Sequence, residues 1–267
     1  MISKNQIKQV KQLETKKHRQ QERLFVAEGP KVVGDLLAAG FRPAEVFATS
    51  EWIAQNEQLR KDIEATPEKQ CKDIEATPEK QCKVVEVTPE ELRKVSFLQH
   101  PQHVLAVFPL PSASDVSRQP LSPLTLALDG VQDPGNLGTI IRIADWFGID
   151  TIVCSPDTAD AWSPKVVQAT MGSIARVNIV YTDLKEYLQQ TSLPICGTLL
   201  DGSDIYAQEL PAEAIIVMGN EGNGISDEIR QMVTHRLLIP QFRPGAESLN
   251  VAIATAITCS EFRRRSY

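Results

Sequence analysis

Six short apolar runs, separated by helical or turn segments, follow residue 123 and constrain the fold of this chain more than any other feature. The runs are Leu124–Leu128, Thr151–Cys154, Val177–Val180, Ile195–Leu199, Ala214–Met218 and Leu237–Ile239. Each has the length of one buried strand, and the segments between them leave room for crossovers. The spacing predicts a parallel, doubly wound α/β sheet that binds ligands at the carboxyl ends of its strands.

The N-terminal third also alternates strands and helices. We predict strands over Leu24–Ala27, Glu45–Thr49 and Val104–Phe108. Glu28-Gly-Pro30 opens an amphipathic helix that ends near Gly40. Thr88-Pro-Glu-Glu91 is a capping box and predicts a short helix over Glu90–Val95. These elements predict a small α/β domain.

Pro109–Pro123 contains four prolines and four serines and is the clearest linker. We therefore predict an N-terminal domain over 1–108, a linker over 109–123 and a second domain over 124–267. Within the first domain, Lys61–Cys71 is repeated identically as Lys72–Cys82. Two copies are too few for a solenoid, so we expect a surface insert, produced by tandem duplication or by a sequence error, and assign it no function.

Composition excludes several classes of protein. There is no apolar run of about 18 residues, and the N-terminus lacks a signal-peptide pattern. The five scattered cysteines form no C-x-x-C pair, so we expect reduced thiols in a cytoplasmic protein. His100 and His103 are the nearest approach to a metal-binding pattern, and we interpret them as surface residues. We expect neither a membrane nor a metal.

The charge is unevenly distributed. The net charge is −6, but residues 1–23 contain seven lysines and arginines against two glutamates, and the chain nears its end with Arg263–Arg265. A polyanion requires local positive potential, which these two clusters would supply. The alternative is a pair of solvated helix faces. Charge alone leaves both interpretations open.

Three segments are each predicted to contain the end of a strand, a loop and the start of a helix, and the first of them is Asp129–Arg142. Asn136 is a candidate N-cap, and Gly148 is a candidate stop for the helix. Ile140, Ile141, Ile143, Ala144 and Trp146 make this helix apolar nearly all round, which predicts burial. Arg142 then needs a partner. Asp145 would serve in a salt bridge, whereas a phosphate or a reacting oxygen would suit the planar guanidinium equally.

Val217–Ser226 and Ile239–Ala252 are the other two segments. The former has three glycines in six positions, which allow backbone to approach a flat ligand, and Glu221 is its polar exception. It matches neither the P-loop nor the G-x-G-x-x-G pattern. In the latter, Ser248 is a candidate N-cap for a helix of small residues. Asn250 is a polar group on that helix and needs hydrogen-bond partners.

In their order, these three segments resemble the motifs of the SpoU family of RNA 2′-O-ribose methyltransferases, within the SPOUT superfamily. The resemblance implies a parallel sheet with a trefoil knot, preceded by a small ribosomal-protein-like substrate-binding domain that residues 22–49 resemble. Val166–Ser173 resembles the family's Ser/Thr-Met-Gly segment. The implied catalytic positions are Asn136, Arg142, Glu221, Ser248 and Asn250, and the implied contacts to S-adenosylmethionine are Thr198, Gly219, Ile239 and Leu249.

The resemblance also implies the partners and the reaction. A homodimer would bring the arginine near the partner subunit's cofactor. The substrate would be a ribosomal or transfer RNA, whose ribose 2′-oxygen attacks the methyl carbon of the sulfonium while Arg142 lies beside the target phosphate. A non-catalytic RNA-binding homologue is the main alternative. An α/β enzyme for another adenine-containing ligand is the second. The sequence does not identify the RNA.

Overall fold

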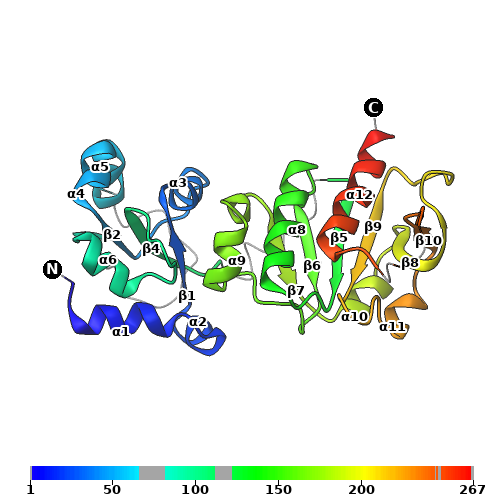
Figure 1. Cartoon of the computed structure of the whole chain (residues 1–267), viewed down its shortest axis with the longest axis horizontal. Helices are drawn as coiled ribbons and strands as arrows, with labels where there is room; N and C mark the ends of the chain where they lie inside the picture. Colours follow the sequence, from blue (N-terminus) through cyan, green and yellow to red (C-terminus); the bar gives the residue numbers. More distant parts are fainter. Residues whose placement is uncertain (1, 66–81, 112–121, 244, 246–247, 266–267) are drawn as a thin grey trace. The chain divides into compact units, whose positions relative to one another are not determined.

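The computed structural model describes residues 2–65, 82–111, 122–243, 245 and 248–265, which form two compact units (Figure 1). The first unit comprises Met1–Asp115 with Trp162–Ala175, and the second comprises Val116–Ala161 with Arg176–Tyr267. Most of the predicted linker, and most of the duplicated insert, lies outside the described residues. No helix in the described part of the chain is long and apolar enough to cross a membrane.

A four-stranded sheet forms the centre of the first unit. Its strands, in spatial order, are β1 (Leu24–Glu28), β4 (Val104–Pro109), β2 (Glu45–Ala48) and β3 (Lys83–Glu86). β4 runs antiparallel to both of its neighbours, whereas β2 and β3 are parallel. The three predicted strands are confirmed. β3 was not predicted, because its two valines are only half-buried and give little apolar signal.

Six helices precede the linker among the described residues of the first unit. They are α1 (Lys4–Gln12), α2 (Lys16–Glu22), α3 (Pro30–Ala38), α4 (Ser50–Gln55), α5 (Glu57–Ala65) and α6 (Pro89–Val95). The Thr88 hydroxyl and the Glu91 carboxylate cap α6 reciprocally, as the sequence predicts. Gly40 follows α3 with a φ of +92°, a left-handed conformation that suits glycine at this position.

The basic N-terminal segment is an integral part of this unit. Val10 and Leu13 are buried in a core cluster with Phe47 and Val95. Arg19 is buried as well, and its guanidinium donates to the carbonyls of Leu13 and Glu14, both at 2.7 Å. One face of α1 therefore belongs to the core, and only the opposite face is solvated.

Residues 162–175 leave the second unit and pack within the first. They contain α9 (Pro164–Ala169) and a short 3₁₀ turn, η1 (Ser173–Ala175). The Trp162 ring lies 4.7 Å from the Phe25 ring, centroid to centroid, and α9 packs on β1. The domain boundaries predicted from the linker place this segment, which includes the Thr-Met-Gly residues, in the second domain (124–267). In the structure it belongs to the first unit.

The second unit is built on six parallel strands. In spatial order they are β10 (His235–Leu238), β8 (Ile195–Asp204), β9 (Ala214–Gly219), β5 (Leu124–Asp129), β6 (Thr151–Cys154) and β7 (Asn178–Tyr181). All neighbouring pairs are parallel. From β5 the chain builds outward through β6 and β7, and it then returns to build the other side. The order therefore reverses between β5 and β9, where doubly wound sheets bind their ligands.

In the described part of this unit the helices are α8 (Pro134–Trp146), α10 (Leu184–Gln189), α11 (Asp227–Arg230) and α12 (Val251–Arg264). α8 packs against α12 (Figure 1). The predicted all-round burial of α8 is wrong. Its buried stripe is Leu137, Ile140, Ile141 and Ala144, whereas Arg142 is exposed and the Trp146 side chain is 85% exposed.

The ends of α8 also differ from the prediction in one respect. Asp133, and not Asn136, is its N-cap, because the Asp133 carboxylate accepts from the Asn136 N–H at 2.8 Å. An Asp before proline at the first helical position is a strong start signal, and it lies three residues before the predicted cap. Gly148 follows the helix with a φ of +62°, as expected of a stop.

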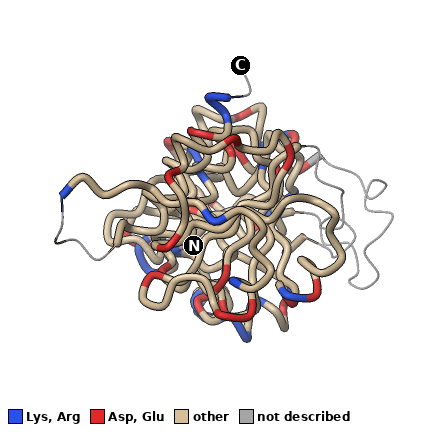
Figure 2. The backbone as a smooth tube through the Cα atoms, turned by 90° about the vertical axis from the view of Figure 1, so that its right-hand side faces the viewer, with Lys and Arg blue, Asp and Glu red and all other residues tan. Residues whose placement is uncertain are grey.

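The three C-terminal arginines are used by the fold. Arg263 donates to the carbonyls of Phe147 (2.6 Å) and Gly148 (2.8 Å), at the end of α8. Arg265 donates to the carbonyls of Ile205 and Tyr206. Arg264 and Arg265 also bond to the buried Glu261 carboxylate (Figure 2 shows this basic end of α12 beside the C label). Arg263 and Arg265 are therefore used mainly within the unit, whereas the Arg264 side chain is 65% exposed.

Glu261 yields a stability prediction. Hydrogen bonds from Arg264 and Arg265 lower its pKa to about 2, so its stabilising contribution is complete above its ordinary pKa and is lost as the pH falls towards 2. We expect Glu261→Gln to lower the melting temperature at pH 7 by a few degrees. Denaturation measured between pH 7 and pH 3 should show the difference from the wild type shrinking on acidification. Glu228→Gln, at an exposed ion pair, should have little effect. A pH-independent difference would contradict the assignment.

Candidate active site

Side chains from all three motif segments meet at the carboxyl ends of β5 and β9. The Asn250 amide donates to the Asn136 Oδ1 at 2.9 Å, and the Asn136 amide donates to the Glu221 Oε1 at 3.0 Å. Glu221 also accepts from the backbone N–H groups of Gln132 and Asp133, at 3.2 and 3.3 Å. One carboxylate and two amides thus join three loops that are up to 114 residues apart in the chain.

The Glu221 carboxylate is held in its charged form. Partial burial raises its pKa, but the hydrogen bonds from Asn136 and from the backbone of Gln132 and Asp133 outweigh that effect, so the pKa is lowered overall. A carboxylate that already accepts three hydrogen bonds is a poor proton acceptor. Its place in the network indicates that it orders the loop after β5 and does not itself act as a base.

The glycine-rich loop after β9 folds back tightly on the end of its own strand. A Cβ on Gly219 would lie 2.2 Å from the carbonyl carbon of Gly224, so only glycine fits there. The Asn220 Oδ1 accepts from the N–H groups of Gly222 (2.9 Å) and Asn223 (3.1 Å), and its amide donates to the Gly130 carbonyl at 2.7 Å. Asn220 therefore closes the loop and ties it to the loop after β5.

Two ordering residues were missed in the sequence. Asn220 is one of them, although an asparagine in a glycine-rich loop is a known signal for a turn closed by its side chain. Asp129, the last residue of β5, is the other. Its Oδ2 accepts from the Ser226 N–H at 2.7 Å and so fixes the start of α11. An acidic residue at a strand end has no such specific signal.

Asn250 begins α12 and has two functions in the structure. Its Oδ1 accepts from the N–H groups of Ala252 and Ile253, so it caps the helix, and its amide donates to Asn136. Asn250 therefore has the hydrogen-bond partners that the sequence indicated it would need. The predicted cap at Ser248 is wrong, because this exposed residue precedes the true cap by two positions. No hydrogen bond to another described residue involves Ser248.

Arg142 projects from α8 into solvent. The salt bridge to Asp145, which the sequence left open, is not formed, because Arg176 binds Asp145 through three hydrogen bonds with a shortest distance of 2.7 Å. Within the described ranges no side chain forms an ion pair with Arg142. Its guanidinium is therefore available to an anionic ligand. The predicted partner is a phosphate, and that role stays a prediction.

The residues implied to bind the methyl donor come from neighbouring strand ends. β10, β8 and β9 are adjacent and parallel, so Ile239, Thr198 and Gly219 share one edge of the sheet. The Thr198 hydroxyl lies 3.6 Å from the Met218 sulfur, next to Gly219. Leu249 precedes the cap of α12, and half of its surface is exposed. The structure brings these positions to one edge, and their ligand stays a prediction.

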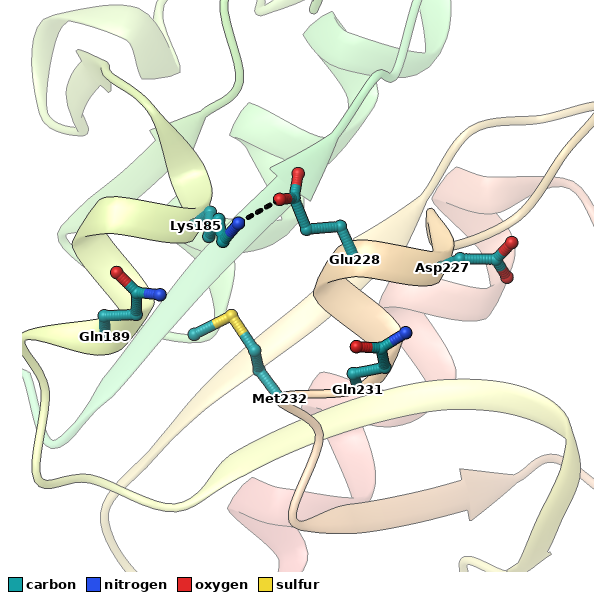
Figure 3. Close-up of a pocket in the computed structure, with 6 residues that line it drawn as sticks. All are labelled: Lys185, Gln189, Asp227, Glu228, Gln231 and Met232. Atoms are coloured by element: carbon teal, nitrogen blue, oxygen red, sulfur yellow. Dashed lines mark hydrogen bonds and ion pairs between the residues drawn. The ribbon is translucent and has the colours of Figure 1, made fainter.

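A hollow lies between α10 and α11, away from these loops (Figure 3). It is lined by Lys185, Gln189, Asp227, Glu228, Gln231 and Met232, and Lys185 donates to Glu228 across it. None of the predicted site residues lines it. No group of three or more His, Cys, Asp or Glu side chains that could hold a metal occurs among the described residues.

The fold and the site define a parallel α/β protein whose ligand loops converge at the switch point of its sheet. Residues 123–260 match the SpoU rRNA Methylase family, and residues 4–106 match the MRM3-like substrate binding domain. The chain therefore belongs to the SpoU family, and the resemblance inferred from its three motifs is confirmed.

Relatives cover almost the whole chain. The 23S rRNA (guanosine(2553)-2′-O)-methyltransferase RlmP of Bacillus subtilis (strain 168) is 32% identical over 98% of this chain and 97% of its own length. A TrmH-family structure from Porphyromonas gingivalis is 40% identical over 99% of each chain, with a TM-score of 0.82. The AdoMet-bound rRNA methyltransferase from Sinorhizobium meliloti is 29% identical, covers 100% of this chain and 98% of its own, and has a TM-score of 0.83. The predicted fold class is confirmed.

The loop network yields a prediction that is independent of activity. Glu221→Gln replaces one of two acceptor oxygens with a donor, so the backbone N–H groups of Gln132 and Asp133 cannot both be satisfied. We expect their amide hydrogen exchange to accelerate about tenfold, as the loss of a hydrogen bond to a charged group implies. Asp227→Asn, an exposed carboxylate nearby, is the control. Unchanged exchange in the Glu221 variant would show that the network does not order the loop.

Proposed function

We propose that this protein transfers a methyl group from S-adenosylmethionine to a ribose 2′-hydroxyl of RNA. The observation that carries the proposal is the hydrogen-bonded chain from Asn250 through Asn136 to Glu221, which joins the three SpoU motifs at the switch point of a parallel sheet. All five polar motif positions are retained. The non-catalytic RNA-binding homologue remains the alternative, and retention of the exposed Arg142 speaks against it.

The residues at the sheet edge fit the methyl donor. Ile239 and Leu249 offer accessible apolar surface, and neighbouring backbone groups offer donors and acceptors, a combination typical of sites for flat heteroaromatic ligands. Thr198 and Gly219 would complete the binding edge. When bound, the sulfonium supplies an electrophilic methyl carbon. The protein contributes the position of the acceptor oxygen relative to that carbon, which is a large part of catalysis for such a displacement.

Arg142 would bind the phosphate of the target nucleotide and place its 2′-oxygen. The guanidinium has several donors in a plane and remains protonated, so it orients and polarises groups more readily than it accepts a proton. The 2′-hydroxyl proton would leave through the adjacent phosphate or through solvent. Asn136, Glu221 and Asn250 hold the loops, and Ser248 lies exposed at the mouth of the site, where it can contact RNA.

Ribosomal RNA is the substrate that we propose, in preference to transfer RNA. RlmP of B. subtilis spans this chain nearly end to end, and its name specifies a 23S rRNA guanosine. A cytoplasmic location and the trefoil knot implied by the family are part of the same proposal. The motif order supports the knot, and the bacterial rRNA methyltransferases among the relatives support the location.

The activity is tested with labelled S-adenosylmethionine and separated fractions of unmodified 23S rRNA, 16S rRNA and transfer RNA. We expect label in 2′-O-methyl nucleosides of 23S rRNA. Arg142→Ala should lower kcat by roughly 100- to 1,000-fold, as expected for the loss of a charge-stabilising group. Its affinity for S-adenosylmethionine should stay within about threefold. Arg236→Ala removes an exposed arginine that pairs with Asp201, and it should be as active as the wild type. Cofactor binding without transfer to any fraction would favour the non-catalytic homologue.

We also propose a homodimer formed through α8 and α12. Trp146 on α8 is 85% exposed, and Ile253 on the adjoining α12 is 52% exposed, while Leu249 and Phe242 precede α12 and are exposed too. Large exposed apolar side chains on two packed helices, and just before one of them, favour an interaction surface here. Arg142 lies one helical turn before Trp146, so a partner that covers this surface would bring its own cofactor edge close to Arg142.

Trp146→Glu should convert the dimer to a monomer, because it places a charge within the apolar interface. Sedimentation velocity measures the change, and methyl transfer should fall in parallel. Leu200→Glu alters a side chain on β8 that is 78% exposed and lies away from this surface, so it should leave the dimer intact. A wild-type monomer, or a dimeric Trp146→Glu variant, would contradict the proposal.

A further inference from the structure

The loop after β6, residues 155–161, borders the loop after β5 on the side away from the edge proposed to bind the cofactor. β5 lies between β9 and β6 in the sheet, and β8 and β10 lie beyond β9 (Figure 1). The loop after β5, which donates to Glu221, therefore has residues 155–161 as its other neighbour. We call these residues the brace loop. The proposed chemistry gives them no role.

Hydrogen bonds join the brace loop to the loop after β5. The Gly130 N–H donates to the Ser155 hydroxyl at 2.9 Å, and the Ala159 N–H donates to the Val131 carbonyl at 2.9 Å. The Gly130 carbonyl also accepts from the amide of Asn220, in the loop after β9. Ser155 is only 5% exposed, and a hydrogen bond shielded from water is stronger than an exposed one. The two loops are therefore fastened to each other at two points.

The Tyr181 hydroxyl holds the far end of the brace loop. Tyr181 is the last residue of β7, and its hydroxyl accepts from the Ala161 N–H at 2.8 Å and donates to the Ala159 carbonyl. One hydroxyl thus satisfies a donor and an acceptor of a segment that lies outside any helix or strand. Ala161 is fully buried, so water would replace this partner poorly if the hydroxyl were removed.

This contact lies where the chain leaves the second unit. Ala161 is the last residue of that unit before residues 162–175, which belong to the first unit. A displacement of residues 162–175 would pass along the backbone to Ala159, and from there to Val131, unless the chain were held at this point. The Tyr181 hydroxyl holds it there, because it bonds both the last residue of the unit and the residue two positions before it.

Val131 connects this contact to the Glu221 network. It directly precedes the two residues whose N–H groups donate to the Glu221 carboxylate. Glu221 also accepts from Asn136, which binds Asn250. Two hydrogen bonds and one step along the backbone therefore link the Tyr181 hydroxyl to the loop that the Glu221 network orders.

A purely structural role for this hydroxyl is the alternative. The core of the unit is filled by apolar side chains on its strands, such as Val153 and Val217, and a tyrosine ring can contribute to packing without its hydroxyl. The hydroxyl itself bonds loop backbone at the carboxyl edge of the sheet, where doubly wound proteins bind their ligands. This placement favours a role in ordering the site.

We propose that Tyr181 is a positioning residue for methyl transfer. Its hydroxyl fixes the brace loop, and through Ala159 and Val131 it keeps the loop before Asn136 in the geometry that places the acceptor oxygen. The inference rests on the proposed function and adds a residue to the same site. A misplacement of about 1 Å can cost roughly 100-fold in rate. Tyr181 should therefore affect kcat, and not the affinity for S-adenosylmethionine, whose proposed edge lies on the other side of β5.

The first test is amide hydrogen exchange in the full chain, which needs no substrate. Tyr181→Phe removes the hydroxyl and keeps the ring. We expect exchange at Gln132 and Asp133 to accelerate roughly five- to tenfold, because the bonds that hold their loop are weakened. In the Glu221→Gln background the effect should be smaller, since both changes act on one loop. Tyr187→Phe, which alters a half-buried tyrosine on α10 in the same unit, is the matched control and should leave this exchange unchanged.

The second test is methyl transfer to an unmodified 23S rRNA transcript. We expect Tyr181→Phe to lower kcat and kcat/KM together, by roughly 10- to 100-fold, as the loss of orientation in the transition state implies. The melting temperature and the affinity for S-adenosylmethionine should match those of Tyr187→Phe, which should be as active as the wild type. A purely structural role would lower the melting temperature and leave kcat unchanged.

Wild-type exchange at Gln132 and Asp133 in Tyr181→Phe would overturn the inference, because the hydroxyl would then not order the loop. Accelerated exchange with an unchanged kcat would overturn it as well, since the order would be irrelevant to transfer. Both results would leave the proposed function intact. A wild-type chain that transfers no methyl group to any RNA fraction would overturn the proposed function, whereas the exchange comparison would still show whether Tyr181 orders the loop.

Discussion

The Glu221 carboxylate is the interaction on which the functional part of the structure depends. It accepts hydrogen bonds from the loop after β5 and from Asn136, which in turn binds Asn250 at the start of α12. Without this group, three loops with few apolar side chains would have little to hold them together. A charged acceptor suits the position, because its bonds to three donors are stronger than those of a neutral amide.

Tight backbone packing around this network limits which residues are acceptable. Gly219 lets the chain return within van der Waals contact of its own strand, and Asn220 closes the turn that follows. Asp129, at the end of β5, accepts from the Ser226 N–H and so fixes the start of α11 that follows this turn. The result is a rigid edge beside the strand ends of β8 and β10. A transferase for two substrates needs such an edge, because orientation supplies much of its rate.

The strands and the site differ in how far the sequence predicts them. Apolar runs located nine strands in advance, because the most buried strands, such as β5, β6 and β9, leave a continuous apolar signal in the sequence. β3, with its half-buried Val84 and Val85, was missed. Motif resemblance located Glu221, Asn136 and Asn250. The Asp133 cap had a local signal in the proline that follows it, whereas the cap at Asn250 instead of Ser248 depends on loop geometry that no local pattern fixed. The exposure of Trp146 was not predicted, because an apolar residue gives the same sequence signal whether it is buried or exposed.

The central claim is that S-adenosylmethionine binds at the loop edge of the sheet. The most direct test is to measure which backbone amides of the intact chain become protected when S-adenosylmethionine is added, by hydrogen exchange or by NMR shifts. Our account predicts that protection will centre on Gly219, Ile239 and Leu249, at the edge shared by β9, β10 and the start of α12. Gln189 and Gln231, which line the hollow between α10 and α11, should remain unchanged. Protection confined to that hollow, or none at saturating cofactor, would contradict the account.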